Sequence, residues 1–215
     1  MFGAGDINGD GKADLLWINK STNQVAYWLM DGTNRIGWYV TSYASGYYPA
    51  ATGDFDGDGL VDIMWTSAKN DLYVWLGNAR KSTGFTPKFV TNYPAGWSIV
   101  GRGDIDGDGR DDLIWMQSSG TSWGYWLMNG ATIKSTTIDA VSAGETLAAV
   151  GDFSGRGFAD LVWNNNGVSL DVWTNTSGLQ GTQLNISFSR GGVFPGVDAS
   201  MPVFNSGIPP ATVTH

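Results

Sequence analysis

Short apolar segments bounded by glycine, asparagine or aspartate recur along most of the chain. Residues 15–17, 63–65, 113–115 and 161–163 each place two apolar residues before a tryptophan. A second apolar segment follows each of them, as in residues 25–30, and a more variable one comes next, as in residues 36–40. None shows sustained helical spacing, and their aromatic content favours β-strands. The pattern therefore predicts an all-β protein.

These segments belong to an internal repeat. A Gly-Asp pair opens each copy at positions 5–6, 53–54, 103–104 and 151–152, in steps of 48, 50 and 48 residues. One tryptophan stands eleven residues after each Asp, and another follows ten or eleven residues later. Eight of the eleven tryptophans are thus in register with the repeat: Trp17, Trp28, Trp65, Trp75, Trp115, Trp126, Trp163 and Trp173.

Each copy predicts four antiparallel strands. Asp31-Gly32 and Asn129-Gly130 supply hairpin signals between the third and fourth strands. Four strands in about forty to fifty residues is the repeat size of propeller blades. We therefore predict a β-propeller of four-stranded antiparallel blades, with four units at approximately residues 1–48, 49–98, 99–146 and 147–190. A sandwich or a β-solenoid is the alternative, but solenoid coils are usually shorter and a sandwich has no reason to repeat its sequence.

Composition narrows the function classes. The 31 glycines among 215 residues agree with many tight turns, and the absence of Cys excludes disulfides and thiol chemistry. The chain has no apolar run of eighteen or more residues, so we expect no membrane span. Its twelve basic residues form no cluster, so nucleic acid is not expected as a partner. The net charge is −8, and Glu145 is the only glutamate among twenty acidic residues.

The aspartates gather in the loop that follows each Gly-Asp pair. We number each loop from that Asp, so that loops 1 to 4 are residues 6–14, 54–62, 104–112 and 152–160. Loops 1 to 3 place oxygen-bearing side chains at positions 1, 3, 5 and 9 and glycines at positions 4 and 6. This spacing matches the first half of an EF-hand loop, in which position 7 binds through its backbone carbonyl. The predicted ligands are Asp6, Asn8, Asp10, Lys12, Asp14; Asp54, Asp56, Asp58, Leu60, Asp62; Asp104, Asp106, Asp108, Arg110 and Asp112.

Calcium is the metal that these ligands favour. All the donors are hard oxygens, which argues against zinc or copper, and a flexible loop suits calcium better than the strict octahedron of magnesium. Asp-Gly stretches are also ordinary turns, but three copies at one repeat position favour a metal site. Three Ca²⁺ ions per chain would change the formal charge from −8 to −2.

Loop 4 departs from this pattern, because Ser154 and Arg156 replace the ligands at positions 3 and 5. We expect no metal there. Instead, the guanidinium of Arg156 is expected to occupy the metal position and to pair with Asp152 and Asp160. Because Gly155 and Gly157 are retained, the loop is expected to keep its shape.

The repeated pattern Gly-Asp-x-(Asp/Asn)-Gly-Asp-Gly-x-x-Asp, followed by an apolar strand ending in Trp, resembles the FG-GAP/VCBS repeats. The likeness covers roughly residues 1–190 and is specific in the first three units. It implies blades like those of integrin α-chain propellers, some fungal lectins and many secreted bacterial proteins, with loops that bind Ca²⁺. Such propellers usually have about seven blades, whereas this chain has four units. Residues 191–215, with a strand-like segment at 202–204, could close the ring; otherwise the chain is a fragment, or two chains complete one ring.

The function classes can be compared in the same way. The only histidine is His215, so Ser/His/Asp or Cys/His catalysis is not expected, and the carboxylates outside the loops share no motif. We therefore expect no enzyme. A calcium-stabilised extracellular module, secreted or on the cell surface, for recognition or adhesion is the leading hypothesis, and a purely structural scaffold or assembly subunit is the alternative. The candidate residues for binding a glycan or a protein are the aromatic rings outside the repeat register: Trp38, Trp97 and Trp123.

Overall fold

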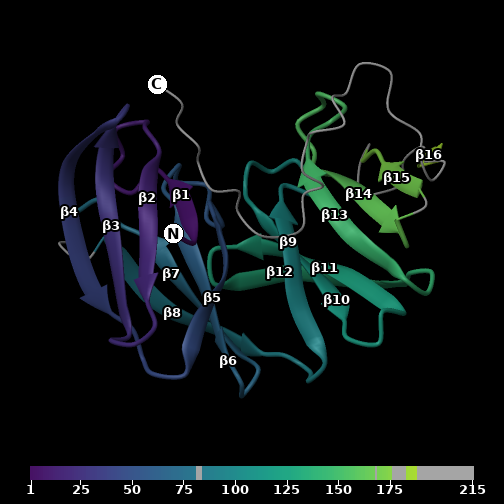
Figure 1. Ribbon diagram of the computed structural model, residues 1–215, viewed down its shortest axis with the longest axis horizontal. Coiled ribbons are helices and arrows are strands. Elements are labelled where there is room, and N and C mark those ends of the chain that lie inside the picture. The colour runs from purple at the N-terminus through teal and green to yellow at the C-terminus, as the bar shows by residue number, and fades with distance from the viewer. Residues whose placement is uncertain (81–83, 168, 176–182, 188–215) are drawn as a thin grey trace.

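The structure is a computed structural model that describes residues 1–80, 84–167, 169–175 and 183–187. In that part of the chain all regular structure is β-strand, arranged as four antiparallel sheets of four strands (Figure 1). No helix there is long and apolar enough to cross a membrane. Sheets 1 and 2 consist of β1 (Gly3–Gly5), β2 (Asp14–Asn19), β3 (Gln24–Asp31) and β4 (Asn34–Ser42), and of β5 (Tyr47–Gly53), β6 (Asp62–Ser67), β7 (Asp71–Gly77) and β8 (Phe85–Asn92). Sheets 3 and 4 consist of β9 (Trp97–Gly103), β10 (Asp112–Gln117), β11 (Ser122–Asn129) and β12 (Thr132–Ala140), and of β13 (Glu145–Gly151), β14 (Asp160–Asn165), β15 (Ser169–Trp173) and β16 (Gln183–Ser187).

The predicted elements are confirmed. Each repeat forms one sheet, and its strands pair in chain order, so that every connection within a sheet is a hairpin or the acidic loop. The glycines of the two predicted hairpin signals have the left-handed backbone that such turns require, with φ of 60° at Gly32 and 58° at Gly130. The local glycine and asparagine signals therefore fix where the strands end.

The four sheets follow one another along an arc, with the first strand of each sheet toward the middle (Figure 1). Strand β1 adjoins β5, β5 adjoins β9, and β9 adjoins β13. Among the described residues the arc does not close into a ring. The proposed closing segment at residues 202–204, with the rest of the 191–215 tail, lies outside the described residues.

The core lies between consecutive sheets. One apolar cluster joins sheets 1 and 2, a second joins sheets 2 and 3, and a third joins sheets 3 and 4. Each sheet from the second on turns its first in-register tryptophan toward the preceding sheet, and these three side chains are buried: Trp65, Trp115 and Trp163. The second tryptophan of the repeat packs beside the first, with ring centroids 5.0 Å apart for Trp65 and Trp75. The repeat of tryptophans is therefore a repeat of sheet-to-sheet contacts.

The loops connect consecutive sheets directly. The N–H at position 8 of one loop donates to the backbone carbonyl at position 1 of the loop before it. Val61 donates to Asp6 at 2.7 Å, Asp111 to Asp54 at 2.7 Å, and Ala159 to Asp104 at 2.6 Å. We call each of these a loop-to-loop hydrogen bond. Because one occurs at every junction, the acidic loops set the spacing of the sheets.

The glycine of the Gly-Asp pair has a packing role at these junctions. A Cβ added to Gly5 would lie 2.6 Å from Cβ of Val61, and one added to Gly103 would lie 2.7 Å from Cβ of Ala159. Carbon atoms cannot approach so closely without displacing one sheet from the other. Glycine is therefore needed where the position-8 side chain of the next loop packs against the first strand.

Replacing Gly103 with alanine is accordingly expected to destabilise the fold. The added methyl group would meet Ala159 and Val150 across the junction of sheets 3 and 4, so we expect a loss of about 1–3 kcal/mol in the free energy of unfolding. Ser98→Ala, at an exposed position of the same strand β9, is the control and should change it by less than about 0.5 kcal/mol. Urea unfolding measures both, and equal stability of the two variants would contradict the packing role.

Candidate metal centre

The backbone of the loops has the shape that the sequence predicts. The glycines at positions 4 and 6 are left-handed in all four loops, with φ between 70° and 83°. The position-1 carboxylate accepts the N–H groups that this bend turns inward. In loop 3, Asp104 accepts from Gly107 at 2.7 Å, from Asp108 at 3.1 Å and from Gly109 at 2.7 Å. Loops 1 and 2 repeat this pattern, so one carboxylate organises the turn.

The position-9 carboxylate holds the loop to its sheet. Asp62 is fully buried, and its oxygens accept from the N–H of Phe55 at 2.8 Å and of Gly77 at 2.7 Å. Asp112 makes the equivalent bonds to Ile105 and Met128, both at 2.8 Å. The sequence predicts these residues only as metal ligands. The sequence does not reveal their structural role, because the donors are backbone N–H groups and not recurrent side chains.

Two groups of carboxylates have the geometry of a metal site. Asp54, Asp56 and Asp62 in loop 2 bring one oxygen each within 4.8 Å of the others, as do Asp104, Asp106 and Asp108 in loop 3. In loop 1, the position-3 ligand is the amide of Asn8, which donates to Asp10 at 3.2 Å. Loops 2 and 3 thus bring three predicted ligands together each, without Asp58 and Asp112, whereas the described residues of loop 1 form no such group.

One observation shows that a cation fits these loops. Oδ1 of Asp56 and Oδ1 of Asp106 are buried and have no hydrogen-bond partner among the described residues. A buried carboxylate oxygen without a partner is costly, whereas a hard cation would satisfy it. Both oxygens belong to the position-3 residue, which is a predicted ligand in both loops and a member of both carboxylate groups. The donor set and these two oxygens therefore fit a hard divalent cation.

The electrostatics of the metal-free loops agree with this fit. Burial, together with the charges of Asp54 and Asp56, raises the pKa of Asp62 to about 7, although two N–H bonds oppose the shift. Burial likewise raises the pKa of Asp112 to about 7. The pKa of Asp56 is also raised, first by burial and then by the charge of Asp58. Without a cation, these carboxylates resist ionisation.

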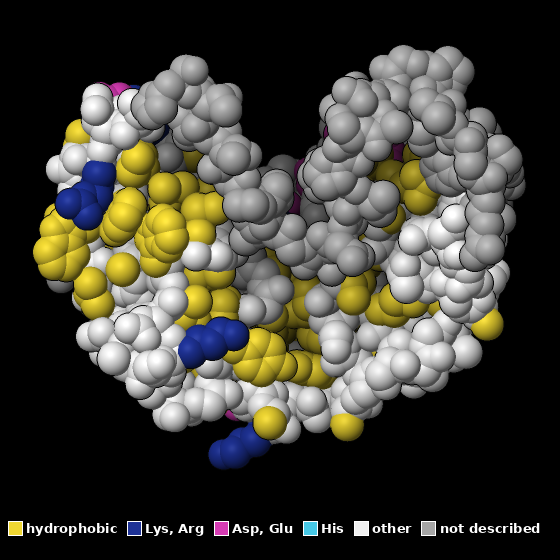
Figure 2. All heavy atoms as spheres, viewed as in Figure 1, with side chains coloured by type: hydrophobic (Ala, Val, Ile, Leu, Met, Phe, Trp, Pro, Cys, Tyr) yellow, Lys and Arg dark blue, Asp and Glu magenta, His cyan; other side chains and the backbone are white. Residues whose placement is uncertain are grey.

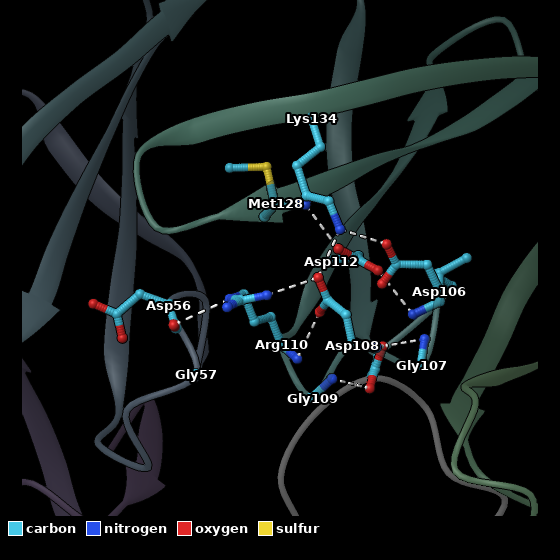
Figure 3. A network of polar contacts seen from close by, with 12 residues as sticks. Asp56, Gly57, Asp106, Gly107, Asp108, Gly109, Arg110, Asp112, Met128 and Lys134 are labelled. Carbon is cyan, nitrogen blue, oxygen red and sulfur yellow. Dashed lines mark hydrogen bonds and ion pairs between the residues drawn. The ribbon is translucent and has the colours of Figure 1, made fainter.

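In loop 3, positively charged side chains of the protein contact the carboxylates (Figure 3). Nζ of Lys134, on β12, lies 2.6 Å from Oδ2 of Asp106 and 2.6 Å from Oδ2 of Asp108. Arg110 contacts the second of these carboxylates at 2.8 Å, and its Nε donates to the carbonyl of Asp56 in the neighbouring loop at 3.1 Å. Burial would raise the pKa of Asp108, but the bonds from Lys134 and Arg110 lower it. The repeat gives no sign of Lys134, because it stands outside the recurrent positions.

Loop 4 corrects one prediction. Its glycines keep the bend, and Asp152 still accepts from the N–H of Arg156 at 2.9 Å and of Gly157 at 2.8 Å. The guanidinium of Arg156, however, is exposed and forms no ion pair with any described residue. Asp160 is fully buried, and its oxygens already accept N–H groups of Ser154 and Asn175. Burying a guanidinium beside it would cost desolvation without supplying a bond that is missing.

The residue at position 7 varies among the loops, but its side chain has a packing role. The side chain there crosses the junction and packs over the position-4 glycine of the preceding loop. A Cβ added to Gly57 would lie 3.2 Å from Arg110, and one added to Gly9 would lie 3.7 Å from Leu60. In loop 1, the side chain of Lys12 pairs instead with Asp31 at 2.9 Å. Position 7 therefore has a packing role besides its predicted backbone ligand.

The three aromatic candidates for ligand binding lie in different environments. Trp123 is only 3% exposed and packs against Trp163 at 5.2 Å, so it belongs to the core between sheets 3 and 4 rather than to a surface site. Trp97 is half-buried at the junction of sheets 2 and 3. Trp38 on β4 is 59% exposed. Sequence alone cannot separate these cases, because all three lie outside the repeat register.

A family model described as an FG-GAP-like repeat matches residues 6–65, 54–115 and 104–163, which together span more than half of the chain. The chain belongs to the FG-GAP-like repeat family. Each match to the FG-GAP-like repeat runs from position 1 of one loop to the first in-register tryptophan of the next repeat, so each contains one complete junction. The resemblance drawn from the sequence is thereby confirmed.

A search of curated proteins gives no match. The solved structures that are similar include one entitled "Structure of Dos1 propeller", with 15% sequence identity and a TM-score of 0.44. The alignment covers 77% of this chain and 42% of that one, so the FG-GAP-like chain spans less than half of that protein's length.

The raised pKa values predict how stability depends on pH. Because Asp62 and Asp112 have pKa values of about 7, against an ordinary value of 3.8, the folded metal-free chain binds more protons than the unfolded chain between these limits. Its stability should therefore fall as the pH rises from about 4 to about 7. The pKa values of Asp71, Asp108 and Asp152 are lowered, so these groups change the stability only at pH values below about 4. Urea unfolding of the metal-free chain tests this, and stability that rises with pH would contradict it.

The position of Lys134 predicts competition with a metal ion. Lys134→Met removes the ammonium from Asp106 and Asp108, so we expect calcium to bind loop 3 about tenfold more tightly, equivalent to about 1.4 kcal/mol. The metal-free variant should be less stable than the parent, because two carboxylates lose their partner. Calorimetric titration measures the first effect and urea unfolding the second. Lys88→Met, at an exposed site on β8, is the control and should change neither; unchanged affinity in Lys134→Met would exclude competition.

Proposed function

We propose that the chain is a calcium-stabilised β-propeller module of four blades, each sheet being one blade, that recognises carbohydrate outside the cell. Three loops with oxygen ligands support one Ca²⁺ each in loops 1 to 3 and none in loop 4. FG-GAP-like repeats are typical of extracellular proteins, where calcium is plentiful enough for weak sites with dissociation constants of about 10⁻⁴–10⁻³ M. In this proposal, the metal ions stabilise the blade junctions and the ligand binds elsewhere.

The observation that carries the recognition role is an aromatic cavity at the junction of blades 1 and 2. Its volume is about 300 Å³, and it opens to the surface. Rings form most of its wall: Tyr43, Tyr47, Trp65, Tyr73, Trp75 and Pro87. Several of them pack edge to face or tilted, with centroids 4.8 Å apart for Tyr43 and Trp65 and 5.6 Å apart for Tyr47 and Tyr73. This packing keeps the rings in fixed positions.

A charged group stands beside this wall. The hydroxyl of Tyr47 donates to Oδ2 of Asp71 at 2.5 Å, and the hydroxyl of Ser67 donates to its Oδ1 at 2.5 Å. Burial would raise the pKa of Asp71, but these two bonds lower it, so the carboxylate stays ionised near neutral pH. A sugar ring combines an apolar C–H face with hydroxyl groups. Aromatic faces next to a carboxylate and hydroxyls offer complements to both.

The next junction repeats the cavity in a smaller form. A space of about 50 Å³ lies between blades 2 and 3, lined by residues that include Tyr93, Trp97, Trp115 and Trp126. Gly124 in this wall pairs with Trp115 in the position that Tyr73 holds beside Trp65 in blade 2. We propose that the first cavity is the sugar-binding one, because its wall has more rings and its volume suits a monosaccharide. Among the sequence-predicted candidates, Trp97 is the one that lines an equivalent site.

A structural role in a larger assembly is the second candidate. It is favoured by apolar surface that two blades leave open, on β4 and in loop 4. The exposed residues there include Ile36, Trp38, Val40 and Phe153. The two roles can coexist, because the cavity lies at an internal junction of the chain.

Calcium is expected to stabilise the fold. An ion that binds only the folded chain adds about 2.7 kcal/mol at a hundredfold excess over its Kd. We expect the melting temperature to rise with calcium and calorimetry to count three ions per chain. Magnesium at the same concentration is the control and should have a smaller effect, because it prefers near-octahedral sites. No rise in melting temperature with calcium would contradict the stabilising role.

Carbohydrate binding is tested first on a glycan array with the calcium-loaded chain. Tyr73→Ala removes one ring of the cavity and should weaken binding of the best glycan about tenfold or more, equivalent to about 1.4 kcal/mol. Val100→Ala, which shortens an exposed side chain on β9 outside both aromatic cavities, should leave binding unchanged. An array without binders, or equal binding by Tyr73→Ala, would refute the sugar site. Specific capture of a protein would then point to protein recognition.

A further inference from the structure

Sheet 1 leaves open the face that the other sheets bury. In sheets 2 to 4, the face that carries the first in-register tryptophan packs on the preceding sheet, and the counterparts of Leu15 are fully buried: Ile63, Leu113 and Leu161. On sheet 1, Leu15 and Trp17 occupy the same positions and are only half-buried. The apolar side chains gather over sheet 1 at the left of Figure 2. This face has the composition of one half of a junction.

Sheet 4 leaves open the face that, in the other sheets, is covered by the next sheet. The position-2 side chain of each other loop is inserted under the next sheet, so Ile7 is 2% exposed and Phe55 and Ile105 are 0% exposed. Their counterpart Phe153 is 57% exposed. Val162 on β14 is half-buried, although the residues at its position in the other sheets are fully buried: Leu16, Met64 and Ile114. Sheet 4 thus presents the residues that a following sheet would cover.

Among the described residues, loop 1 has the donor of a loop-to-loop hydrogen bond without an acceptor, and loop 4 has the acceptor without a donor. Within the described residues, the N–H of Ala13 at position 8 of loop 1 and the carbonyl of Asp152 at position 1 of loop 4 have no backbone partner. A Cβ added to Gly151 would meet only the ring of Phe153, at 3.5 Å, where the equivalent glycines meet the position-8 residue of the next loop. A Cβ added to Gly155 would meet no atom of the described residues within 4 Å, whereas the position-4 glycines of the other loops meet the position-7 side chain of the next loop. Phe153 therefore covers the place that a position-8 side chain takes elsewhere.

We propose that two copies of this chain associate head to tail, with sheet 4 of one against sheet 1 of the other. The new contact repeats the three internal junctions: the N–H of Ala13 donates to the carbonyl of Asp152, and Phe153 moves from Gly151 to the buried position of Ile7, Phe55 and Ile105. A two-fold arrangement satisfies both ends of both copies and gives a ring of eight sheets. A second copy of the chain fits both open faces, because its sheet 4 complements sheet 1 and its sheet 1 complements sheet 4.

The outer rim stays free in this arrangement. Trp38 pairs with Trp28, and the residues in its place on sheets 2 and 3, Pro87 and Thr136, remain exposed although their junctions are formed. The aromatic cavity of blades 1 and 2 is internal to one chain. Association and carbohydrate binding therefore use different surfaces, and the failure of one proposal would not affect the other.

The experiment is sedimentation of the full 215-residue chain in millimolar calcium, from micromolar to submillimolar concentration. The parent should reach twice the monomer mass. Phe153→Glu places a charge in the sheet-4 half and Ala13→Glu places one in the sheet-1 half, so each variant alone should be monomeric. Phe89→Glu is the matched control, because Phe89 is also exposed but lies on the outer strand β8 of an internal sheet; it should dimerise like the parent.

Mixing the two monomeric variants is the decisive step. Each retains the half that the other has lost, so an equimolar mixture should form a one-to-one dimer through a single intact junction. Circular dichroism spectra equal to that of the parent, and a melting temperature that still rises with calcium, show that both variants are folded. A parent that stays monomeric at every concentration would overturn the proposal. Dimers that survive both substitutions, or a mixture that stays monomeric, would overturn it as well.

Discussion

The arrangement of the sheets depends on one contact, the loop-to-loop hydrogen bond from position 8 to the carbonyl at position 1. It has nearly the same length at all three junctions, and the glycine beside it lets the chains approach closely. Position 1 also supplies the carboxylate that organises its own loop, and position 9 anchors the loop to the sheet. A nine-residue segment therefore performs three tasks: it turns the chain, holds the turn to its sheet and positions the next sheet. The tryptophans then fill the space that this spacing leaves.

Sequence reasoning predicts the parts that repeat as residue types. Strand order and the left-handed glycines of the loops follow from recurrent residues, and the structure shows that the recurrent Trp65, Trp115 and Trp163 are buried. It does not predict contacts made by backbone groups, such as the two N–H bonds of Asp62, or by side chains that occur once, such as Lys134. The glycine of the Gly-Asp pair lies between these cases. Its recurrence is visible in the sequence, but the reason for it, the Cβ of Val61 or Ala159 in the next loop, is visible only in the structure.

The error about Arg156 and the finding of Lys134 have the same physical cause. In loop 4, N–H groups of the chain already donate to the oxygens of Asp152 and Asp160, so the guanidinium of Arg156 would gain no unpartnered oxygen by turning inward. A side chain at position 5 starts at the tip of the bend and extends into solvent at little cost. Lys134 extends from the neighbouring strand β12 over the open side of loop 3 and can meet two carboxylates at 2.6 Å. The positions of residues within the loop therefore do not show which cationic side chain neutralises the loop's carboxylates.

Loop 4 separates the shape of the loop from its charge. It has lost the position-3 and position-5 carboxylates, yet its glycines keep φ of 70° and 83°, and Asp152 still accepts the N–H groups of the bend. Its position-8 residue, Ala159, also makes the same hydrogen bond to the preceding loop as the acidic loops make. The bend therefore needs only the position-1 and position-9 carboxylates and two glycines. The additional carboxylates of loops 2 and 3 contribute repulsion and two buried oxygens without partners, which only a cation removes. Under the proposed function, calcium would therefore act by offsetting charge that the loop carries in addition to what its shape requires.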